Sequence, residues 1–173
     1  MSSDLERAVG LIRTVPDYPS AGVLFRDITP LLADAAAFTA VVGAMAEPVS
    51  GCDVVVGIEA RGFLLGAAVA YAAGIGVVPA RRLGKLPAVA ASREYQLEYG
   101  TAILELPAQT LSPGARVFIV DDVLATGGTM AASCELVEQV GAVVSGIGVL
   151  IELVALGGRQ RLDGYFVHAL LSY

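Results

Sequence analysis

Two adjacent acids, Asp121 and Asp122, follow an apolar run in the segment VFIVDDVLATGGT, which spans residues 117–129. Neighbouring like charges repel one another and strands disfavour aspartate, so the pair gains nothing for the fold alone. We expect the strand to end near Val120 and the next helix to begin around Gly128, with a small loop between them. The loop residues are Ala125, Thr126, Gly127, Gly128 and Thr129.

The loop and the acids have complementary chemistry. Backbone N–H groups at a helix N-terminus, threonine hydroxyls and the positive end of the helix dipole all favour a phosphate. Gly127 and Gly128 let the backbone approach such a group closely. Asp121 and Asp122 are suited to accept hydrogen bonds from the vicinal hydroxyls of a ribose. The spacing therefore indicates a sugar-phosphate site, and the alternative is an acidic turn followed by a glycine-rich helix cap.

The composition predicts a single α/β domain over residues 1–173. The chain is 55% hydrophobic but only 6% aromatic and has no tryptophan. Its core must therefore be built from Ala, Val, Leu and Ile, as in proteins with buried parallel strands. The formal net charge is −6 and no stripe of Lys and Arg occurs, which argues against a nucleic-acid partner.

Neither secretion nor a membrane location is indicated. The N-terminus carries acids where a signal peptide carries bases. Residues 63–80 are uncharged, but two glycines and Pro79 interrupt them, so we expect a buried helix, a turn and a short strand there. Cys52 and Cys134 lie far apart in apolar surroundings. We therefore expect a cytoplasmic protein with both thiols reduced.

Apolar periodicity predicts alternating strands and helices. A helix over 4–14 and a breaker-rich loop over 16–27 come first, and Asp34 is expected to cap a helix over 35–46. Further helices are expected over 63–73, 128–139 and 155–161, and strands over 54–58, 75–80, 101–106, 117–121, 143–151 and 165–168. The alternation predicts a doubly wound, mainly parallel sheet with helices on both faces and ligands outside the carboxyl ends of the strands.

One polar stretch, RRLGKLPAVAASREYQLEYGT at 81–101, interrupts this alternation. It carries basic residues in an otherwise apolar part of the chain. Long excursions of this kind in compact domains are usually functional. The alternative is a plain solvated loop.

Other phosphate and metal motifs do not occur in the sequence. The only Gly-Lys pair, Gly84-Lys85, is followed by leucine, so the P-loop pattern fails. The glycine pairs at 74/76 and 146/148 lack the third glycine of a dinucleotide-binding fingerprint. One histidine and two separated cysteines do not make a zinc site.

The segment VFIVDDVLATGGT resembles the phosphoribosyl-pyrophosphate signature of type I phosphoribosyltransferases. Further segments resemble the adenine-using branch of that family, in the same order and over almost the whole chain: DYPSAGVLFRDITPLL (17–32), GIEARGFLLG (57–66), RRLGKLP (81–87), YQLEYG (95–100) and IELVALGGRQRL (151–162). The resemblance implies a mobile lid loop and a small N-terminal hood on the predicted fold. It also implies a purine-salvage enzyme that transfers the 5-phosphoribosyl group from phosphoribosyl pyrophosphate to adenine, giving AMP and pyrophosphate.

The same resemblance implies roles for individual residues. The loop at 125–129 would hold the 5′-phosphate, and Asp121 and Asp122 would meet the ribose hydroxyls. The residues implied at pyrophosphate are Glu59, Ala60, Arg61, Arg81 and Lys85, and those implied at adenine are Leu24, Phe25 and Arg26. Two ordinary interpretations stay open: a surface salt bridge for Arg61, and core filling instead of base stacking for Phe25.

Glu98 in the LEYG sequence carries the catalytic hypothesis. Attack by N9 of a purine on the anomeric carbon is helped when N7 gains a proton. A carboxyl group kept partly protonated by burial can supply that proton. The alternative is a glutamate at a strand edge. The lone histidine, His168, is expected to be a core or interface residue.

Lysine usage favours adenine over 6-oxopurines. Family members that act on 6-oxopurines resemble one another in a lysine of the C-terminal half against the purine oxygen, whereas Lys85 is the only lysine here. Two alternatives stay open, namely a phosphoribosyltransferase for another base and a catalytically reduced, purine-sensing regulator. The resemblance also implies a homodimer. Mg²⁺ is expected to arrive bound to phosphoribosyl pyrophosphate, because departing pyrophosphate needs charge neutralisation.

Overall fold

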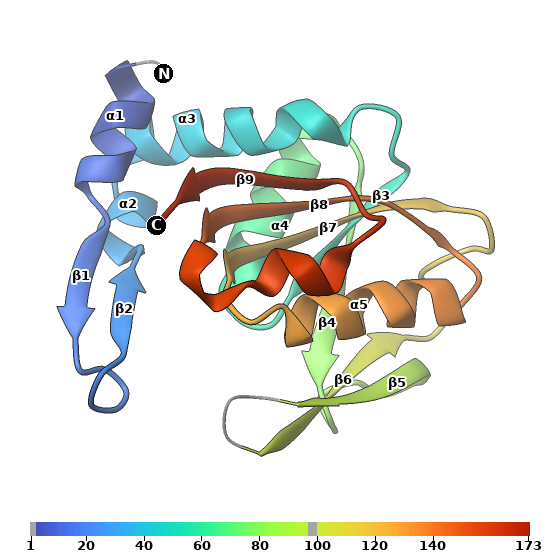
Figure 1. The fold of residues 1–173 in the computed structure, drawn as a ribbon. Coiled ribbons are helices and arrows are strands. Elements are labelled where there is room, and N and C mark those ends of the chain that lie inside the picture. Colours follow the sequence, from blue (N-terminus) through green and yellow to red (C-terminus); the bar gives the residue numbers. More distant parts are fainter. Residues whose placement is uncertain (1–2, 97–99) are drawn as a thin grey trace. The chain divides into compact units, whose positions relative to one another are not determined.

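The computed structural model describes residues 3–96 and 100–173 (Figure 1). The chain divides into two compact units, an N-terminal unit that ends at Ala44 and a C-terminal unit that begins at Met45. A small hairpin and the first helices belong to the N-terminal unit, and the large sheet belongs to the C-terminal unit.

The N-terminal unit is built from short elements. They are α1 (Ser3–Gly10), β1 (Arg13–Pro16), β2 (Leu24–Asp27), α2 (Thr29–Ala33) and α3 (Ala35–Ala46), the last of which reaches the second unit. The helix predicted over 4–14 ends earlier than predicted, at Gly10. The short helix α2 is not among the predicted elements. The prediction of a loop over 16–27 is wrong for β2, which forms an antiparallel hairpin with β1. Val15 is β-branched and pairs with Phe25, so the breaker residues occupy only the turn.

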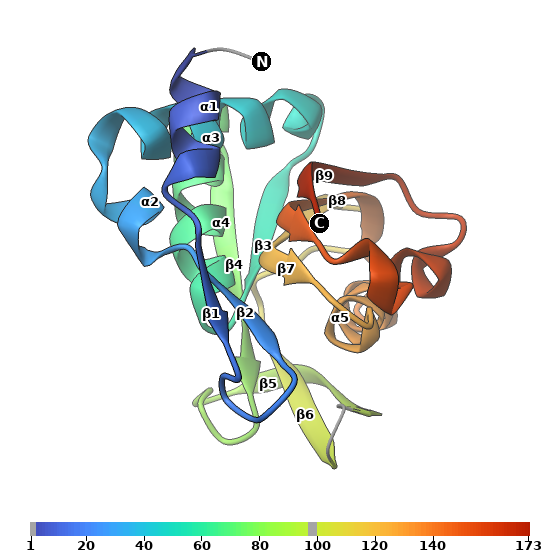
Figure 2. The ribbon, with the colours of Figure 1, turned by 60° about the vertical axis from the view of Figure 1, so that its left-hand side comes forward.

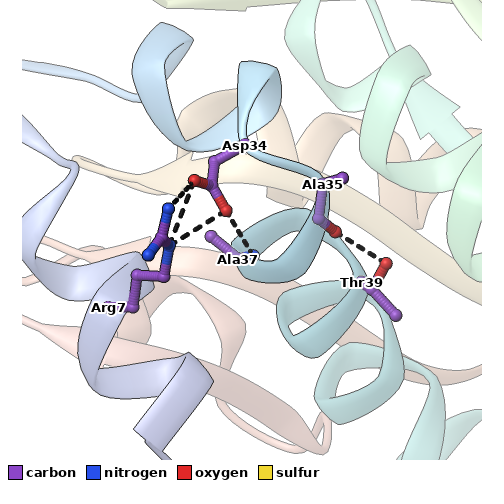
Figure 3. A network of polar contacts seen from close by, with 5 residues as sticks. All are labelled: Arg7, Asp34, Ala35, Ala37 and Thr39. Carbon is purple, nitrogen blue, oxygen red and sulfur yellow. Dashed lines mark hydrogen bonds and ion pairs between the residues drawn. The ribbon is translucent and has the colours of Figure 1, made fainter.

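Asp34 caps α3, as predicted. Its Oδ1 accepts a hydrogen bond from the Ala37 backbone N–H at 3.0 Å, and Arg7 of α1 binds the same carboxylate (Figure 3). The Arg7 guanidinium and the Ala37 N–H together lower the pKa of Asp34 to about 2. The carboxylate is therefore ionised at neutral pH and joins the first helix of this unit to the third.

The C-terminal unit contains one seven-stranded sheet. Its elements, with 3₁₀ helices written η, are η1 (Glu47–Val49), β3 (Val54–Ile58), α4 (Arg61–Ala73), β4 (Gly76–Arg82), β5 (Val89–Gln96), β6 (Thr101–Pro107), β7 (Arg116–Leu124), α5 (Gly128–Gln139), β8 (Val143–Glu152), η2 (Val154–Leu156), η3 (Gly158–Leu162) and β9 (Val167–Ser172). The strand order is β5-β6-β4-β3-β7-β8-β9. Every neighbouring pair from β4 to β9 is parallel, whereas β6 runs antiparallel to both β4 and β5. The prediction of a mainly parallel α/β sheet is confirmed.

Helices cover both faces of this sheet, as predicted. α4 packs on β3, β4 and β7, whereas α5 packs on β5, β6, β7 and β8 from the opposite side of the sheet (Figure 2). A large buried cluster between the sheet and α5 includes Val56, Ile119 and Leu136, which are small or medium aliphatic side chains. Cys52 and Cys134 are both free thiols, in agreement with the prediction.

The polar stretch at 81–101 interrupts the alternation by adding a strand. β5 pairs antiparallel with β6, and its side chains Ala91 and Tyr95 are buried. Arg93, on the same side of β5, forms an ion pair with Glu135 of α5. The expectation of a loop is therefore wrong for β5, because pairing with β6 and burial of Ala91 and Tyr95 outweigh the polar composition of the strand.

The C-terminal segment differs from its prediction in detail. Two 3₁₀ helices, η2 and η3, replace the single helix predicted over 155–161, and Gly157 separates them with a φ of 65°. β9 is longer than predicted and carries the half-buried His168. No helix among the described residues is both long enough and apolar enough to span a membrane.

The glycine pair at 146/148 makes room for an aromatic ring inside the sheet. A Cβ atom at Gly146 would lie 2.8 Å from the ring of Phe118, and one at Gly148 would lie 2.7 Å from it. Phe118 is fully buried and has no free direction in which to move. These glycines are therefore explained by packing on Phe118.

We expect Gly148→Ala to lower the free energy of unfolding by about 1–3 kcal/mol, because the added methyl group overpacks the buried Phe118 ring. Gly43→Ala is the matched control, since a Cβ atom there meets nothing within 4 Å, and it should stabilise α3 by about 0.5–1 kcal/mol. Urea denaturation measures both changes. Equal stability of the two variants would show that Gly148 is not needed for packing.

Candidate active site

β7 continues through both acids instead of ending near Val120. Its neighbour β3 pairs with it only as far as Val120, whereas β8 pairs with it up to Leu124, opposite Glu152. The hydrogen bonds to β8 keep Asp121 and Asp122 within the strand. The two acids therefore lie where one flank of β7 is open, at the carboxyl edge of the parallel strands.

Both acids have partners within the protein. Asp121 Oδ1 accepts a hydrogen bond from the Asp122 backbone N–H at 2.8 Å. The Asp122 side chain is only 7% exposed, and its Oδ2 lies 2.7 Å from Nε of Arg61, the first residue of α4. A Cβ atom at Gly62 would lie 2.8 Å from Asp121 Oδ1, so glycine at this position lets the first turn of α4 approach the acids. α4 thus supplies the cation that balances a buried carboxylate.

Burial sets the protonation behaviour of the pair. Loss of hydration raises the pKa of Asp121 well above its ordinary value, and the neighbouring charge of Asp122 raises it further. Loss of hydration also raises the pKa of Asp122, although the Arg61 guanidinium offsets part of this effect. The free protein therefore holds two carboxyl groups that gain from any ligand offering hydrogen-bond donors or positive charge.

The phosphate loop, residues 125–129, leads directly into α5. Gly127 has a φ of 81°, a conformation that other residues rarely adopt, and α5 begins at Gly128 as predicted. A cavity of about 70 Å³ is lined by Asp121 and by residues 123–130. Because α5 is a helix of 12 residues, its free N–H groups and the positive end of its dipole lie at this cavity.

A second cavity, of about 370 Å³, joins four segments of the C-terminal unit: the turn between β3 and α4, the end of β4, the end of β5, and β7 with the loop that follows it. Its lining residues are Glu59, Ala60, Arg61, Arg82, Tyr95, Asp121, Asp122, Val123, Ala125 and Thr129. The structure therefore brings together the turn predicted at pyrophosphate, the two acids and part of the phosphate loop. Cations and loop N–H groups suit a phosphorylated anion, and the carboxylates suit the hydroxyls of a sugar.

Arg82 and Tyr95 line this cavity but are not among the residues predicted from the sequence. Consecutive residues of a strand point to opposite faces, so Arg81 and Arg82 diverge, and a basic pair alone does not tell which one faces the site. Tyr95 follows Ala91 on the buried side of β5. The sequence gives little signal for this side of β5, because Arg93 lies between Ala91 and Tyr95 on the same side and breaks the apolar alternation.

Arg81 and Arg82 both contact Glu59. Arg81 Nε lies 3.3 Å from Glu59 Oε2, and the Arg82 backbone N–H donates a hydrogen bond to the same oxygen at 2.9 Å. These groups, the Arg82 N–H most of all, lower the pKa of Glu59. In the following turn the Lys85 carbonyl accepts a hydrogen bond from Arg81 Nη1 at 3.2 Å. Glu59 thus holds the end of β4 in place beside the cavity.

The residues predicted at adenine lie on β2, in the N-terminal unit. Leu24 is exposed, and the Phe25 ring packs edge-on against Tyr18 with ring centres 5.1 Å apart. Arg26 donates a hydrogen bond back to β1. Glu98, the predicted acid, lies outside the described residues.

The lining of the 370 Å³ cavity fits a metal ion carried by a substrate. Within residues 3–96 and 100–173, no group of three or more His, Cys, Asp and Glu side chains is arranged to hold a metal ion. The cavity nevertheless presents the carboxylates of Glu59, Asp121 and Asp122. Oxygen ligands of this kind suit Mg²⁺, which commonly binds through few carboxylates together with substrate phosphates.

Comparisons with known proteins define the class. A model of the phosphoribosyl transferase domain matches residues 32–167, and the chain belongs to this family. An adenine phosphoribosyltransferase of Saccharopolyspora erythraea is 57% identical over 172 residues, which are 99% of this chain and 94% of the relative.

Solved structures of similar proteins agree in fold over nearly the full length. The adenine phosphoribosyltransferase of Thermoanaerobacter pseudethanolicus matches with a TM-score of 0.94 and 48% identity, over 98% of this chain and 99% of that one. The Saccharomyces cerevisiae enzyme, solved with adenine and an imino-altritol bisphosphate, matches with a TM-score of 0.92 and 37% identity, over 99% of this chain and 100% of that one.

We expect Asp121→Asn to stabilise the free protein, and to do so more at about pH 8 than at about pH 4. Folding raises the pKa of Asp121, so its contribution to stability is fully present below the unfolded pKa of about 3.9 and is lost as pH rises through the folded pKa. Asparagine does not titrate and keeps the oxygen that accepts the Asp122 N–H. Thermal unfolding across this pH range measures the difference.

Asp53→Asn is the matched control with the opposite sign. Hydrogen bonds from Arg116 lower the pKa of Asp53, so its contribution appears above the unfolded pKa and is lost as pH falls. Asp53→Asn should therefore destabilise the protein at neutral pH. A destabilising effect of Asp121→Asn at about pH 8 would contradict the unfavourable burial inferred for this carboxyl.

Proposed function

We propose that this protein transfers the 5-phosphoribosyl group of phosphoribosyl pyrophosphate to adenine, giving AMP and pyrophosphate. The observation that carries the proposal is the cavity in which Arg61, the paired acids and the phosphate loop converge. Relatives that are 57% and 52% identical over nearly the whole chain are adenine phosphoribosyltransferases, which supports the same activity here.

The sugar phosphate is bound from two directions in this proposal. Backbone N–H groups of residues 125–129 and the hydroxyls of Thr126 and Thr129 bind the 5′-phosphate. Asp121 and Asp122 accept hydrogen bonds from the ribose hydroxyls, which supply the donors that the half-buried Asp121 and the buried Asp122 need. The bond from C1′ to the pyrophosphate oxygen breaks, the bond to N9 of adenine forms, and the hydrogen on N9 leaves as a proton to solvent. Positive charge develops on the sugar in the transition state. The adjacent carboxylates stabilise that charge.

Pyrophosphate leaves towards the basic side of the cavity. Arg61 and Arg82 line it, and the turn at Glu59 and Ala60 offers backbone groups beside them. Arg81 and Lys85, which follow on β4 and its turn, are proposed to contact the same anion. Mg²⁺ bound to the pyrophosphate offsets its negative charge when it leaves.

Adenine is the proposed base for two reasons. The Saccharomyces cerevisiae structure contains adenine, and Lys85 is the only lysine of this chain, so no lysine of the C-terminal half is available for a 6-oxo group. Leu24, Phe25 and Arg26 of the N-terminal unit are proposed to contact the base. Residues 81–101 are proposed to act as a lid that excludes water during transfer.

A cytoplasmic homodimer is the proposed form of the enzyme. α4 exposes Leu64 and Tyr71, which are 55% and 89% accessible and lie two helical turns apart on one face. Val77 of β4 is also exposed. Apolar surface of this kind is the expected contact area for a second copy of the chain.

A base panel tests the proposed function. With phosphoribosyl pyrophosphate and Mg²⁺, adenine should give AMP and pyrophosphate, whereas guanine, hypoxanthine, xanthine, orotate and uracil should give little product. Chromatographic detection of the nucleotide and a coupled pyrophosphate assay measure turnover independently. Faster turnover with another base would replace adenine as the substrate, and inactivity with every base would favour a purine-sensing regulator.

Glu98→Gln should lower kcat with adenine by about 10²–10⁴-fold, because glutamine keeps the size of the side chain but cannot donate a carboxyl proton. The KM for phosphoribosyl pyrophosphate should hardly change, since other residues bind the sugar phosphate. Wild-type activity should also fall as pH rises through the pKa of the acid.

Glu94→Gln is the control for this substitution. Glu94 is an exposed glutamate of β5, four residues from Glu98, and its replacement should leave kcat unchanged. Turnover of Glu98→Gln at the wild-type rate would rule out Glu98 as the proton donor and leave substrate positioning to explain catalysis.

A further inference from the structure

The segment IELVALGGRQRL, at 151–162, has no role in the chemistry described so far. It contains the end of β8, the helices η2 and η3, Gly157 between these helices, and Gly158 as the first residue of η3. In the folded protein it lies directly against the phosphate loop.

At Gly158 the two segments meet backbone to backbone. A Cβ atom built at Gly158 would lie 2.2 Å from the Ala125 carbonyl oxygen and 2.9 Å from the Gly127 nitrogen. A Cβ atom at Gly127 would lie 2.4 Å from the Gly158 carbonyl oxygen. A side chain on either glycine would therefore force the two backbones apart, and the phosphate loop would have to move.

Arg159 fixes the position of Gly158. Its Nε lies 2.9 Å from Glu152 Oε1 and its Nη2 lies 2.5 Å from Oε2, an arrangement in which the planar guanidinium binds both carboxylate oxygens. Its Nη1 also donates a hydrogen bond to the Val167 carbonyl of β9 at 3.0 Å. Arg159 thus ties the start of η3 to two neighbouring strands of the sheet.

Glu152 connects this ion pair to the other side of the phosphate loop. It is buried at the end of β8 and pairs in register with Leu124, the residue immediately before the loop. The Leu153 N–H also donates a hydrogen bond to the Leu124 carbonyl at 2.9 Å. The phosphate loop therefore follows directly from β7 and contacts Gly158 through Ala125 and Gly127. The Arg159–Glu152 ion pair connects Gly158 to the strand β8, which pairs with β7.

We infer that Gly158 and the Arg159–Glu152 ion pair position the phosphate loop so that its N–H groups converge on the 5′-phosphate. The inference rests on the proposed function, and it makes Arg159 and Glu152 positioning residues that do not touch the substrate. Because lysine cannot reproduce the fork of hydrogen bonds, even the charge-conserving Arg159→Lys should loosen the loop.

Gly158→Ala and Arg159→Lys test this role. Both should raise the KM for phosphoribosyl pyrophosphate and the Kd for ribose 5-phosphate, by about tenfold or more for Gly158→Ala and several-fold for Arg159→Lys. The KM for adenine should stay within about twofold of the wild-type value. A twofold change corresponds to only a fraction of the free energy of one hydrogen bond. Titration calorimetry with ribose 5-phosphate gives the Kd without any reaction.

Gly164→Ala is the matched control. Gly164 lies two residues beyond this segment and has a φ of 90°, so alanine strains the backbone, but a Cβ atom there meets nothing within 4 Å. It should lower the melting temperature and leave both sugar-phosphate constants unchanged. If Gly158→Ala does not fold, the binding constants of Arg159→Lys decide whether the positioning role is supported or overturned.

The outcomes separate this inference from the proposed function. Wild-type-like binding of ribose 5-phosphate by folded Gly158→Ala or, if that variant does not fold, by Arg159→Lys would overturn the positioning role even if the wild type converts adenine. Weakened binding in both variants, together with a wild type that does not use adenine, would support the positioning role and reject only the proposed base. Loss of stability that matches Gly164→Ala without any change in binding would show a purely structural segment.

Discussion

Two adjacent carboxyl groups at the carboxyl edge of the parallel strands are unfavourable unless a cation and hydrogen bonds offset their lost hydration, and Arg61 supplies the cation here. That requirement organises the site. Gly62 brings the first turn of α4 against Asp121, and β8 holds both acids in β7 beyond the end of its pairing with β3. In the proposal, the hydroxyl groups of the sugar supply the hydrogen-bond donors that the acids still lack. The lost hydration of the two carboxyl groups therefore explains both their raised pKa values and their affinity for the ligand.

Close backbone contact is the second constraint. The phosphate loop has Gly158 against its back, and Gly128 faces the Gln96 carbonyl oxygen, which would lie 2.8 Å from a Cβ atom. A loop enclosed in this way loses little conformational entropy when it binds a phosphate. Glycine at 127, 128 and 158 therefore serves the rigidity of the site, although glycine usually favours flexibility.

Much of the fold and part of the site can be predicted from the sequence. The apolar run at 54–58 and the helix at 128–139 match the structure, because the strand is marked by consecutive apolar residues and the helix start by Gly127 and Gly128. β5 escapes prediction because its partner β6 and helix α5 bury Ala91 and Tyr95, which is a tertiary effect.

At the site, the acids and the phosphate loop form one continuous signature, so local sequence is enough to find them. Arg82 is different, because only the register of β4 decides that it, and not its neighbour, lines the cavity. The contact of Gly158 with the phosphate loop joins segments distant in sequence, and nothing in either segment alone reveals it.

The most direct test of the site is a crystal structure of the protein with AMP. The 5′-phosphate should lie against the N–H groups of residues 125–129, with the ribose hydroxyls on Asp121 and Asp122. A phosphate bound away from this loop, or ribose hydroxyls turned away from both acids, would contradict the proposed site.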